Sequence, residues 1–236
     1  MNSLTDLDVL VLAGGQGTRL RSVVGERAKV LAEVAGKPYL FHLLSHLGGQ
    51  GIQRVILALG CFHQEVLDYL DGQSFEGLQV VPVVEEELLG TAGAMHNALP
   101  VLESDPVFVL NGDTFADIRL DSLLAFHQRQ SADVTLAVAY KENIERYGSV
   151  EIDESGGVSR FIEKGKSESG HVSAGIYVMS RQVIQGIPPN RKVSWERDTL
   201  PGLVGHGLFA WCGPFRFLDI GTPDSYERAA EFLAKP

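Results

Sequence analysis

The fold is decided by a stretch near the start of the chain, Val9-Leu10-Val11-Leu12-Ala13-Gly14-Gly15-Gln16-Gly17-Thr18-Arg19-Leu20. It begins as a short apolar run typical of a buried strand and continues into three glycines and an arginine. Glycines let the backbone turn so that several N–H groups converge on an anion, and the guanidinium of Arg19 adds a planar donor suited to phosphate oxygens. Ligands of open α/β sheets bind beyond the carboxyl ends of the strands, so the stretch predicts an anion site at such an edge.

Two better-known glycine motifs do not fit this stretch. A Walker loop ends in Gly-Lys-Ser or Gly-Lys-Thr, whereas this one has Gly17-Thr18-Arg19. The dinucleotide fingerprint would use Gly15 and Gly17, but Leu20 stands where its third glycine is needed. A strand-to-helix turn without any ligand is the plain alternative, and Arg19 argues against it.

Apolar runs alternate with helical patterns through the first half of the chain. The expected strands are Val9–Ala13, Val55–Leu59, Val80–Val84 and Val107–Leu110, and the expected helices are Pro38–Leu47, Glu65–Leu70 and Ala92–Leu99. Such alternation implies a mostly parallel sheet with helices on both faces. The sequence therefore predicts a Rossmann-like, doubly wound α/β core.

The alternation of strands and helices stops after Asp133, where strand-like runs follow one another with few helices between them. These runs are Val134–Ala139, Val150–Ile152, Val158–Ile162 and Ile176–Met179. We expect antiparallel hairpins, one of them with its turn at Asp153–Gly157, and a final helix at Asp224–Leu233. No linker is visible, so we expect one domain over 1–236, with a first part at about 1–132 and an antiparallel elaboration at about 133–236.

Composition limits the partners. The 236 residues are 44% hydrophobic and carry a formal net charge of −10, which argues against a nucleic acid or an anionic membrane as partner. A polyanionic ligand would therefore need a local group of Lys and Arg and a divalent metal. No apolar run approaches the roughly 20 residues of a membrane span, and Met1–Asp8 does not resemble a secretory signal, so a cytoplasmic protein is expected. Cys61 and Cys212 lack metal-site spacing, and we expect both in the core.

Two carboxylates occupy equivalent sequence positions. Asp113 follows an apolar strand and a glycine, and Asp219 ends another apolar strand. A pair of carboxylates at carboxyl-terminal strand ends suits Mg²⁺, which binds one or two carboxylates together with phosphate oxygens. The alternative for each is a cap or turn residue, because Thr222-Pro223 itself predicts a helix start.

The motifs together resemble the sugar-1-phosphate nucleotidyltransferase family. They follow its order over nearly the whole chain: Leu12–Leu20 with Lys29 and Gly36-Lys37-Pro38, Gly90–Ala94, Asn111–Asp113, Phe161–Lys164, Ser173–Tyr177 and Asp219–Pro223. Within the family, Arg19–Val24 and Val109–Thr114 resemble bacterial D-glycero-α-D-manno-heptose 1-phosphate guanylyltransferases. The resemblance implies a GT-A-like fold with a sugar-binding elaboration, and transfer of a nucleoside monophosphate to a sugar 1-phosphate with release of pyrophosphate.

The resemblance and the required charges assign roles to individual residues. The expected catalytic residues are Arg19, Lys29, Asp113 and Lys164, with Asp113 and Asp219 holding the metal. The expected nucleotide contacts are Leu12, Ala13, Gly14, Gly15, Gly17, Thr18, Arg19, Glu85, Gly90, Thr91 and Ala92. The expected sugar-phosphate contacts are Asn111, Gly148, Glu163, Lys164, Ser173 and Gly175.

Glu85 favours guanine as the base. Guanine presents two neighbouring N–H donors that one carboxylate accepts together, whereas uracil and thymine present an acceptor beside a donor and suit an amide. The expected partners are thus GTP and a sugar 1-phosphate, with D-glycero-α-D-manno-heptose 1-phosphate first and mannose 1-phosphate or another hexose 1-phosphate as alternatives. An acidic surface turn at Glu85-Glu86-Glu87 is the plain alternative.

Some positions depart from the family pattern. Val30 and Gly165 replace prolines that usually follow the two lysines, and Ser173 stands where asparagine is common. A cytidylyltransferase or a molybdopterin-type guanylyltransferase is the rival within the same chemistry, and a catalytically silent sugar-nucleotide sensor is the rival of another class. The chain ends soon after Leu233, so we expect no β-helix extension. A homo-oligomer is compatible with the sequence.

Overall fold

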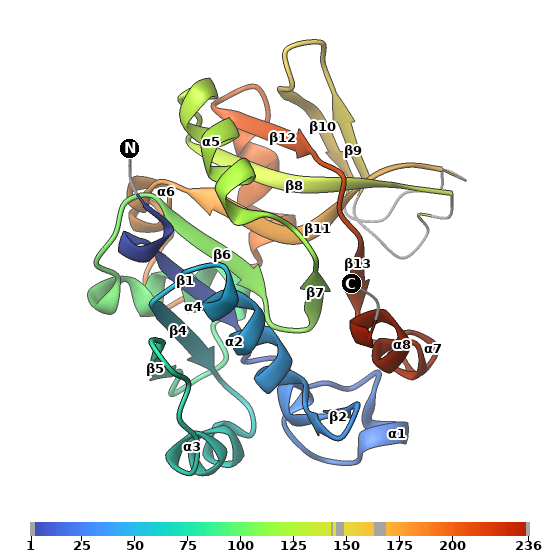
Figure 1. Cartoon of the computed structure of the whole chain (residues 1–236). Coiled ribbons are helices and arrows are strands. Elements are labelled where there is room, and N and C mark those ends of the chain that lie inside the picture. The colour runs from blue at the N-terminus through green and yellow to red at the C-terminus, as the bar shows by residue number, and fades with distance from the viewer. Residues whose placement is uncertain (1–2, 143, 145–148, 163–168, 235–236) are drawn as a thin grey trace.

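One mixed sheet organises the chain. The computed structural model describes residues 3–142, 144, 149–162 and 169–234. Within them nine strands form a sheet in the order β10-β9-β11-β6-β1-β4-β5, with β8 paired to β11 and β12 paired to β8 (Figure 1). This confirms the α/β class and the mixed sheet expected from the sequence.

The first half supplies the parallel part of the sheet. It consists of β1 (Asp8–Leu12), β4 (Arg54–Leu59), β5 (Gln79–Val84) and β6 (Val107–Asn111). Strand β1 lies in the middle and is parallel to both β4 and β6, and β5 is parallel to β4. The four expected strands of this half are confirmed, and their carboxyl ends lie at one edge.

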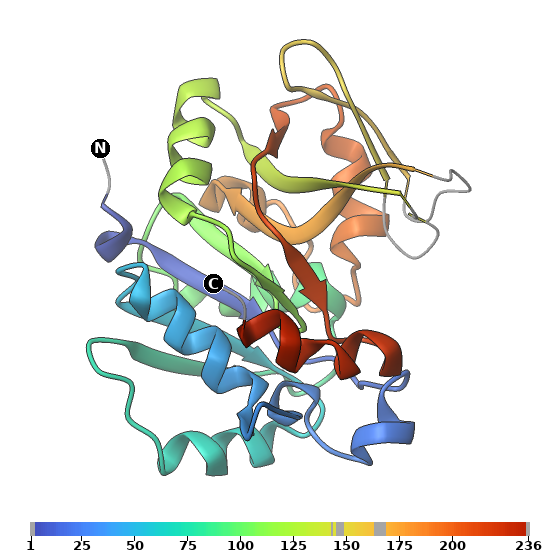
Figure 2. The same ribbon diagram turned by 45° about the vertical axis from the view of Figure 1, so that its right-hand side comes forward.

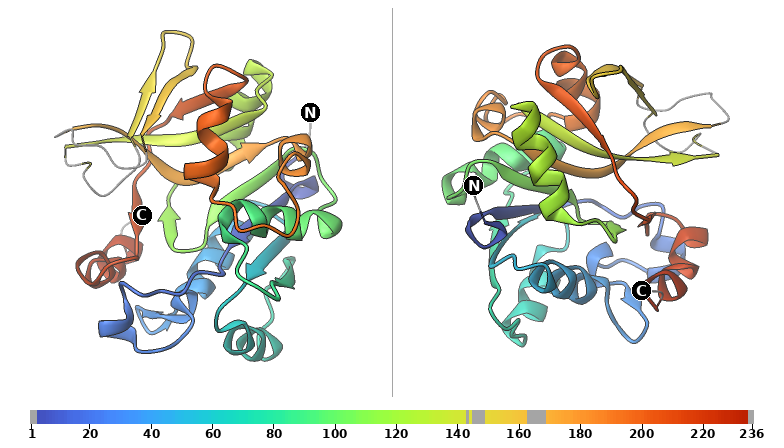
Figure 3. Two further views of the ribbon diagram at one scale, coloured as in Figure 1. Left: turned by 180° about the vertical axis from the view of Figure 1, so that it is seen from behind. Right: turned by 45° about the horizontal axis from the view of Figure 1, so that its top comes forward.

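Helices cover both faces, as the burial of four consecutive residues of β1 requires. Val9 and Val11 belong to one apolar cluster together with α2 (Tyr39–Gly49), α3 (His63–Asp71) and α5 (Leu120–Gln130). Leu10 belongs to the other cluster, with α4 (Gly90–Ala98), α6 (Arg181–Gln185) and the turns η4 (Trp195–Thr199) and η5 (Leu200–Leu203). The reverse view in Figure 3 shows α4 and these turns together on that second face.

The second half extends the sheet beyond β6. Strand β11 (Gly170–Met179) is antiparallel to β6 and to β8 (Val134–Lys141), and β9 (Ser149–Ile152) forms a hairpin with β10 (Val158–Ile162). Asp153 Oδ1 stabilises the expected turn by accepting bonds from the amides of Ser155 and Gly157 at 2.8 and 2.9 Å. The expected antiparallel pairing of these four runs is confirmed, and β12 (Leu208–Cys212), which was not expected from the sequence, adds a strand parallel to β8.

The expected single C-terminal helix was also wrong. The chain forms α7 (Pro223–Glu227) and α8 (Ala229–Ala234), with Arg228 between them. The break lets two aromatic residues reach different partners, since the Tyr226 hydroxyl donates to the Glu33 carbonyl and Phe232 packs edge-on against Phe115. Cys61 is only partly buried and Cys212 is exposed, which corrects the expectation that both are core residues.

Several short elements were not expected from the sequence. They are α1 (Arg21–Val24), β2 (Glu33–Val34), β3 (Lys37–Pro38), β7 (Thr114–Ala116), β13 (Phe217–Asp219) and the turns η1 (Leu4–Asp6), η2 (Lys29–Leu31) and η3 (Leu99–Val101). Among the described residues, the helices are too short or too polar to cross a membrane.

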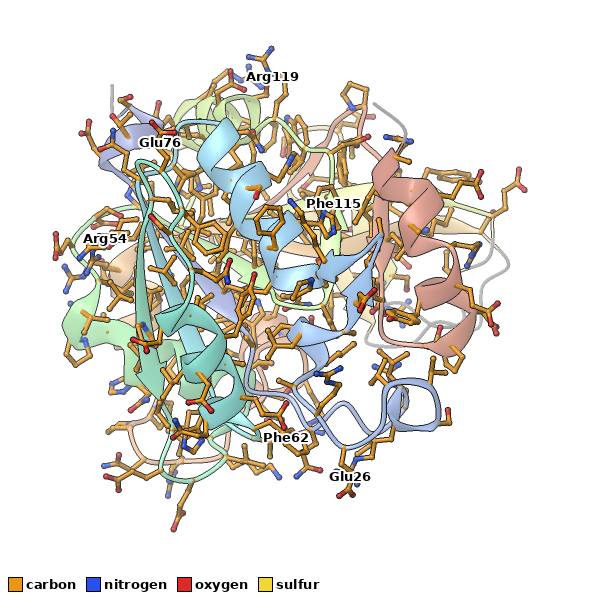
Figure 4. The ribbon with its side chains drawn as sticks, turned by 60° about the horizontal axis from the view of Figure 1, so that its bottom comes forward. Glu26, Arg54, Phe62, Glu76, Phe115 and Arg119 are labelled. Atoms are coloured by element: carbon orange, nitrogen blue, oxygen red, sulfur yellow. The ribbon has the colours of Figure 1, made fainter. Side chains whose placement is uncertain are left out.

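Strands β7 and β13 form a separate antiparallel ribbon beside the main sheet, and Figure 2 shows β13 leading down to the C-terminal helices. Phe115 anchors the ribbon because its ring lies 4.8 Å from His46 of α2 and 6.2 Å from Phe232 of α8. Figure 4 shows Phe115 between those helices. The ribbon therefore fixes where β13, and Asp219 at its end, lie relative to the sheet.

Candidate active site

A cleft of about 690 Å³ opens at the carboxyl edge of the parallel strands. Its walls come from the loop after β1, the turns after β5 and β6, the start of α4, strand β11 and the segment before η4. The lining residues are Leu12, Ala13, Gly14, Gly15, Gln16, Arg19, Lys29, Val30, Glu85, Leu88, Gly90, Thr91, Ala94, Asn111, Gly112, Asp113, Thr114, Phe161, Ser173, Ala174, Lys192, Glu196, Phe217 and Asp219. This is the edge at which the sequence predicts a ligand.

The glycine-rich loop is held against the ends of neighbouring strands. The Gly112 amide donates to the Leu12 carbonyl at 3.0 Å, and a Cβ on Gly112 would come within 2.7 Å of that oxygen. On the other side, the Cys61 amide donates to the Gly14 carbonyl at 3.3 Å. Glycine at 112 is thus required for β1 and β6 to end side by side.

Asp113 and Asp219 come together through the β7–β13 ribbon. Asp219 is paired with Thr114, the residue after Asp113, and the Ile220 amide donates to the Asp113 carbonyl at 2.9 Å. The Gly221 amide donates to Oδ1 of Asp219 at 2.5 Å and orients that carboxylate. Neither aspartate caps a helix, because Asp113 is followed by strand β7, and the N-cap of α7 is Thr222, which makes a capping box with Ser225.

Lys29 lies between the two aspartates. Its Nζ is 2.5 Å from Oδ2 of Asp113 and 3.8 Å from Oδ1 of Asp219. Burial raises the pKa of Asp219, the neighbouring charge of Asp113 raises it further, and Lys29 and Arg19 oppose both effects. The two carboxylates therefore repel each other and are held together by a shared cation.

Glu85 lines the cleft and is only 8% exposed. Its Oε2 lies so close to the glycines that a Cβ on Gly14 would come within 3.1 Å of it and a Cβ on Gly60 within 2.9 Å. Its Oε1 is buried and has no hydrogen-bond partner among the described residues. Burial raises the pKa of Glu85 to about 7, opposed by a backbone hydrogen bond with Leu89. A buried, unsatisfied acceptor is costly, so it indicates a place for a ligand donor.

The start of α4 is joined to the segment before η4. Gly90 has φ +72°, and a Cβ there would come within 2.6 Å of the Val193 carbonyl. The same carbonyl accepts the Ala92 amide at 3.0 Å, and Thr91 Oγ1 accepts the Trp195 amide at 2.7 Å. These bonds bring Lys192 and Glu196, on either side of Trp195, to the cleft wall.

A chain of three hydrogen bonds connects β11 to Glu196. The Gly175 amide donates to Ser173 Oγ at 3.2 Å, Ser173 Oγ lies 3.2 Å from the Tyr177 hydroxyl, and that hydroxyl donates to Glu196 Oε1 at 3.4 Å. Tyr177 is fully buried and packs edge-on against Trp195, with ring centroids 5.8 Å apart. The carboxylate of Glu196 is therefore oriented by a rigid core residue.

Most of the expected contact residues line the cleft, and some do not. Gly17, Thr18, Ala92 and Gly175 are not part of the lining. Ala92 is fully buried with its amide used by Val193, and Gly175, at φ +67°, packs against the side chain of Asn111. Gly148, Glu163 and Lys164 lie outside the described residues.

Sequence reasoning missed several residues of the cleft lining. Lys192 and Glu196 carry charge into the cleft, and Leu88, Phe161 and Phe217 supply apolar surface. The only sequence signal for Glu196 is its place next to Trp195, a large residue that had to be buried. Its neighbours Arg197 and Asp198 are exposed, so composition gives no reason to choose Glu196 among them.

An α/β sheet with a glycine-rich loop and a lysine-bridged pair of aspartates at its carboxyl edge defines a nucleotide-binding protein of the phosphoryl-transfer class. Comparison with known families makes this specific. The chain belongs to the nucleotidyl transferase family, whose model matches residues 8–236.

Two curated relatives and one solved structure are similar over nearly the whole chain. D-glycero-α-D-manno-heptose 1-phosphate guanylyltransferase of Aneurinibacillus thermoaerophilus is 33% identical over 96% of this chain and 98% of its own length. Mannose-1-phosphate guanylyltransferase of Mycobacterium tuberculosis is 36% identical over 97% of this chain, which spans 65% of that relative. HddC from Yersinia pseudotuberculosis has a TM-score of 0.87 at 34% identity, covers 96% of this chain and 99% of its own, and has also been solved in complex with GMP-PN.

Proposed function

We propose that the chain is a guanylyltransferase that transfers GMP from GTP to a sugar 1-phosphate and releases pyrophosphate. The observation that carries the proposal is the Lys29 ammonium held within 4.0 Å of both Asp113 and Asp219 in the cleft beside the glycine-rich loop. Such an arrangement serves a reaction between two phosphate anions, where charge must be neutralised before the atoms can approach.

The donor set fits a hard divalent cation. Asp113 and Asp219 are the residues that would hold Mg²⁺, because both carboxylates already face one cation and both line the cleft. They provide the one or two carboxylates that Mg²⁺ takes in sites completed by phosphate oxygens and water. Bound there, the ion would neutralise charge on the reacting phosphates.

The remaining chemistry is assigned to the chain's own charges. An oxygen of the sugar phosphate attacks the α-phosphorus of GTP, a new P–O bond forms, and the bond to the β-phosphate breaks so that pyrophosphate leaves. Arg19 and Lys29 bind the β- and γ-phosphates and stabilise the leaving group. The resemblance assigns Lys164 to the sugar phosphate.

Guanine is the base that Glu85 accommodates best. Its Oε1 needs a donor, and the N1–H and N2–H groups of guanine give two donors to one carboxylate. The two guanylyltransferase relatives and the GMP-PN complex of HddC support the same base. Uracil and thymine would place an acceptor against a buried carboxylate.

The sugar is proposed to bind in the same cleft, near Ser173 and Glu196. D-glycero-α-D-manno-heptose 1-phosphate is the first candidate because the chain spans 98% of a relative that bears that name. Mannose 1-phosphate is the second, supported by a relative at 36% identity. The two sugars share the manno ring, so both candidates make the same demands on the ring-binding residues.

A matrix of four nucleoside triphosphates against several sugar 1-phosphates tests the proposal, with pyrophosphate release as the readout in the presence of Mg²⁺. We expect the highest rate with GTP and a sugar of manno configuration. A preference for UTP or dTTP would contradict the base assignment. Binding of a nucleotide sugar without pyrophosphate release from any pair would favour a catalytically silent sensor instead.

A further inference from the structure

The ammonium of Lys29 occupies the place that a cation shared by Asp113 and Asp219 would take. It makes ion pairs of 2.5 and 3.8 Å with them, and the Lys29 side chain is only 12% exposed. Gly221 makes room for it, because a Cβ at that position would come within 2.9 Å of Nζ. The lysine is thus built into the acidic pair and is not a solvated surface charge.

An ammonium and a magnesium ion cannot share this position. Mg²⁺ demands oxygen ligands at about 2.0–2.1 Å in octahedral geometry, and Lys29 holds Oδ2 of Asp113 at 2.5 Å. Lys29 must move before a metal can enter, and moving breaks two partly buried ion pairs. Removing a charge from such a pair is unfavourable unless another anion receives it.

A triphosphate is the anion that can receive it. Lys29 lines the same cleft as Gly14, Gly15 and Arg19 of the glycine-rich loop. We propose that Lys29 keeps the metal site closed in the free protein and opens it by moving to the bound triphosphate, so that nucleotide and metal bind as a coupled pair. The coupling must be reciprocal, since each ligand favours the same position of Lys29. This inference rests on the proposed function for the identity of the nucleotide.

Metal binding without nucleotide tests the inference directly. The probe is Mn²⁺, which takes the same oxygen ligands and whose free ion is measured by electron paramagnetic resonance. The wild type is compared with Lys29→Met, and with Lys29→Gln in case the first variant does not fold, as judged by circular dichroism. Lys192→Met is the matched control, because it removes one positive charge from the same cleft.

We expect Lys29→Met to bind Mn²⁺ at least tenfold more tightly than the wild type, and Lys192→Met to change the affinity less than threefold. Adding Asp113→Asn to Lys29→Met should abolish the gain. Equal affinity of the wild type and both Lys29 variants would overturn the proposal, and so would an equal gain in Lys192→Met, because that gain would reflect only the charge of the cleft.

The result is separable from the proposed function. A wild type that releases no pyrophosphate with any substrate pair, while Lys29→Met still gains Mn²⁺ affinity, would contradict guanylyl transfer and leave the closed metal site standing. Pyrophosphate release by the wild type, together with unchanged Mn²⁺ affinity in Lys29→Met, would support guanylyl transfer and overturn the closed metal site.

Discussion

The carboxylate of Glu85 fills the space that the missing side chain of Gly14 leaves open. A Cβ on Gly14 would lie 3.1 Å from Oε2 of Glu85, so a larger residue at that position would force the loop after β1 and the end of β5 to shift apart. The contact places the buried carboxylate beside the loop that we propose binds the triphosphate. In the proposed function, recognition of the base and of the phosphates would therefore both depend on the packing of Glu85 against Gly14.

Replacing Glu85 by Gln should change the preferred base. The amide offers one donor and one acceptor, so it loses the bonds to guanine N–H groups and matches uracil or thymine. Each hydrogen bond to a charged group contributes about 1.5–3 kcal/mol, so kcat/KM for GTP should fall about a hundredfold. The exposed neighbour Glu86→Gln is the matched control. An unchanged ratio of GTP to UTP turnover in the Glu85 variant would refute the assignment.

Glu85 should also make GTP binding depend on pH near neutrality. Burial raises its pKa to about 7, so the carboxylate that accepts guanine N–H groups is lost as pH falls below that value. KM for GTP should rise between pH 8 and pH 6 in the wild type and stay flat in Glu85→Gln. Steady-state kinetics at constant ionic strength, over a range in which the fold is intact, would check this.

The raised pKa of Glu85 should also make the free energy of unfolding depend on pH. Here the charged carboxylate, which favours GTP binding, is expected to destabilise the free protein. The pKa of Glu85 is about 4.5 when unfolded and about 7 when folded, so the folded state binds the proton more tightly. Stability is therefore lost as pH rises from about 4.5 to 7, and the cost is fully present above 7. Urea unfolding at pH 8 should show Glu85→Gln to be more stable than the wild type, by up to about 3 kcal/mol. At pH 4.5 the difference should be small.

Asp113→Asn should abolish most turnover without unfolding the protein. The side chain would lose its charge, while the backbone bond from Ile220 to the Asp113 carbonyl is unaffected. Removal of one group that stabilises charge in a transition state, such as an oxyanion-hole donor, lowers kcat about a hundredfold to a thousandfold, and we expect a similar loss here. Asp224→Asn, an exposed aspartate on α7, is the control. Near-normal kcat in Asp113→Asn would exclude its proposed metal role.

Glu196→Gln should weaken binding of the sugar and leave the nucleotide unaffected. KM for the sugar 1-phosphate should rise about tenfold, the loss expected for one charge-assisted hydrogen bond, with KM for GTP unchanged. Tyr177→Phe removes the hydroxyl that orients Glu196 and should give a smaller rise. If both variants instead raised KM for GTP, Glu196 would belong to the nucleotide end of the cleft.

Sequence patterns predicted the parts of the site that follow regular elements. The four parallel strands and Asp113 could be predicted because each strand is an apolar run of ordinary length ending near a glycine or carboxylate. Helix α5 was missed even though Leu120, Leu123, Leu124 and His127 have helical spacing and are buried.

Other features could not be read from local patterns. The ribbon that brings Asp219 to Asp113 has strands of three residues, and strands this short do not show the alternation of apolar and polar residues by which a strand is recognised. Lys192 and Glu196 reach the cleft through the contact of Val193 with Gly90, two segments about a hundred residues apart. Only the folded chain shows that contact, because nothing periodic in the segment indicates it.

Arg54→Ala should reduce stability without altering the site. Arg54 lies at the start of β4, the end opposite the cleft, and its Nη1 is 2.6 Å from Oδ1 of Asp8, a side chain only 3% exposed. Removing one partner of a buried pair leaves the other charge uncompensated, although Asp8 keeps the amide of Ser104 at 3.0 Å. We expect a loss of about 3 kcal/mol in the free energy of unfolding, measured by urea denaturation, with KM for both substrates unchanged. Arg160→Ala, which breaks an exposed pair with Glu151, is the control and should cost at most about 1 kcal/mol. If Arg54→Ala lowered kcat without lowering the free energy of unfolding, the two ends of the sheet would be coupled. The partners of Arg54, which are Asp8, Val101 and Glu103, do not line the cleft.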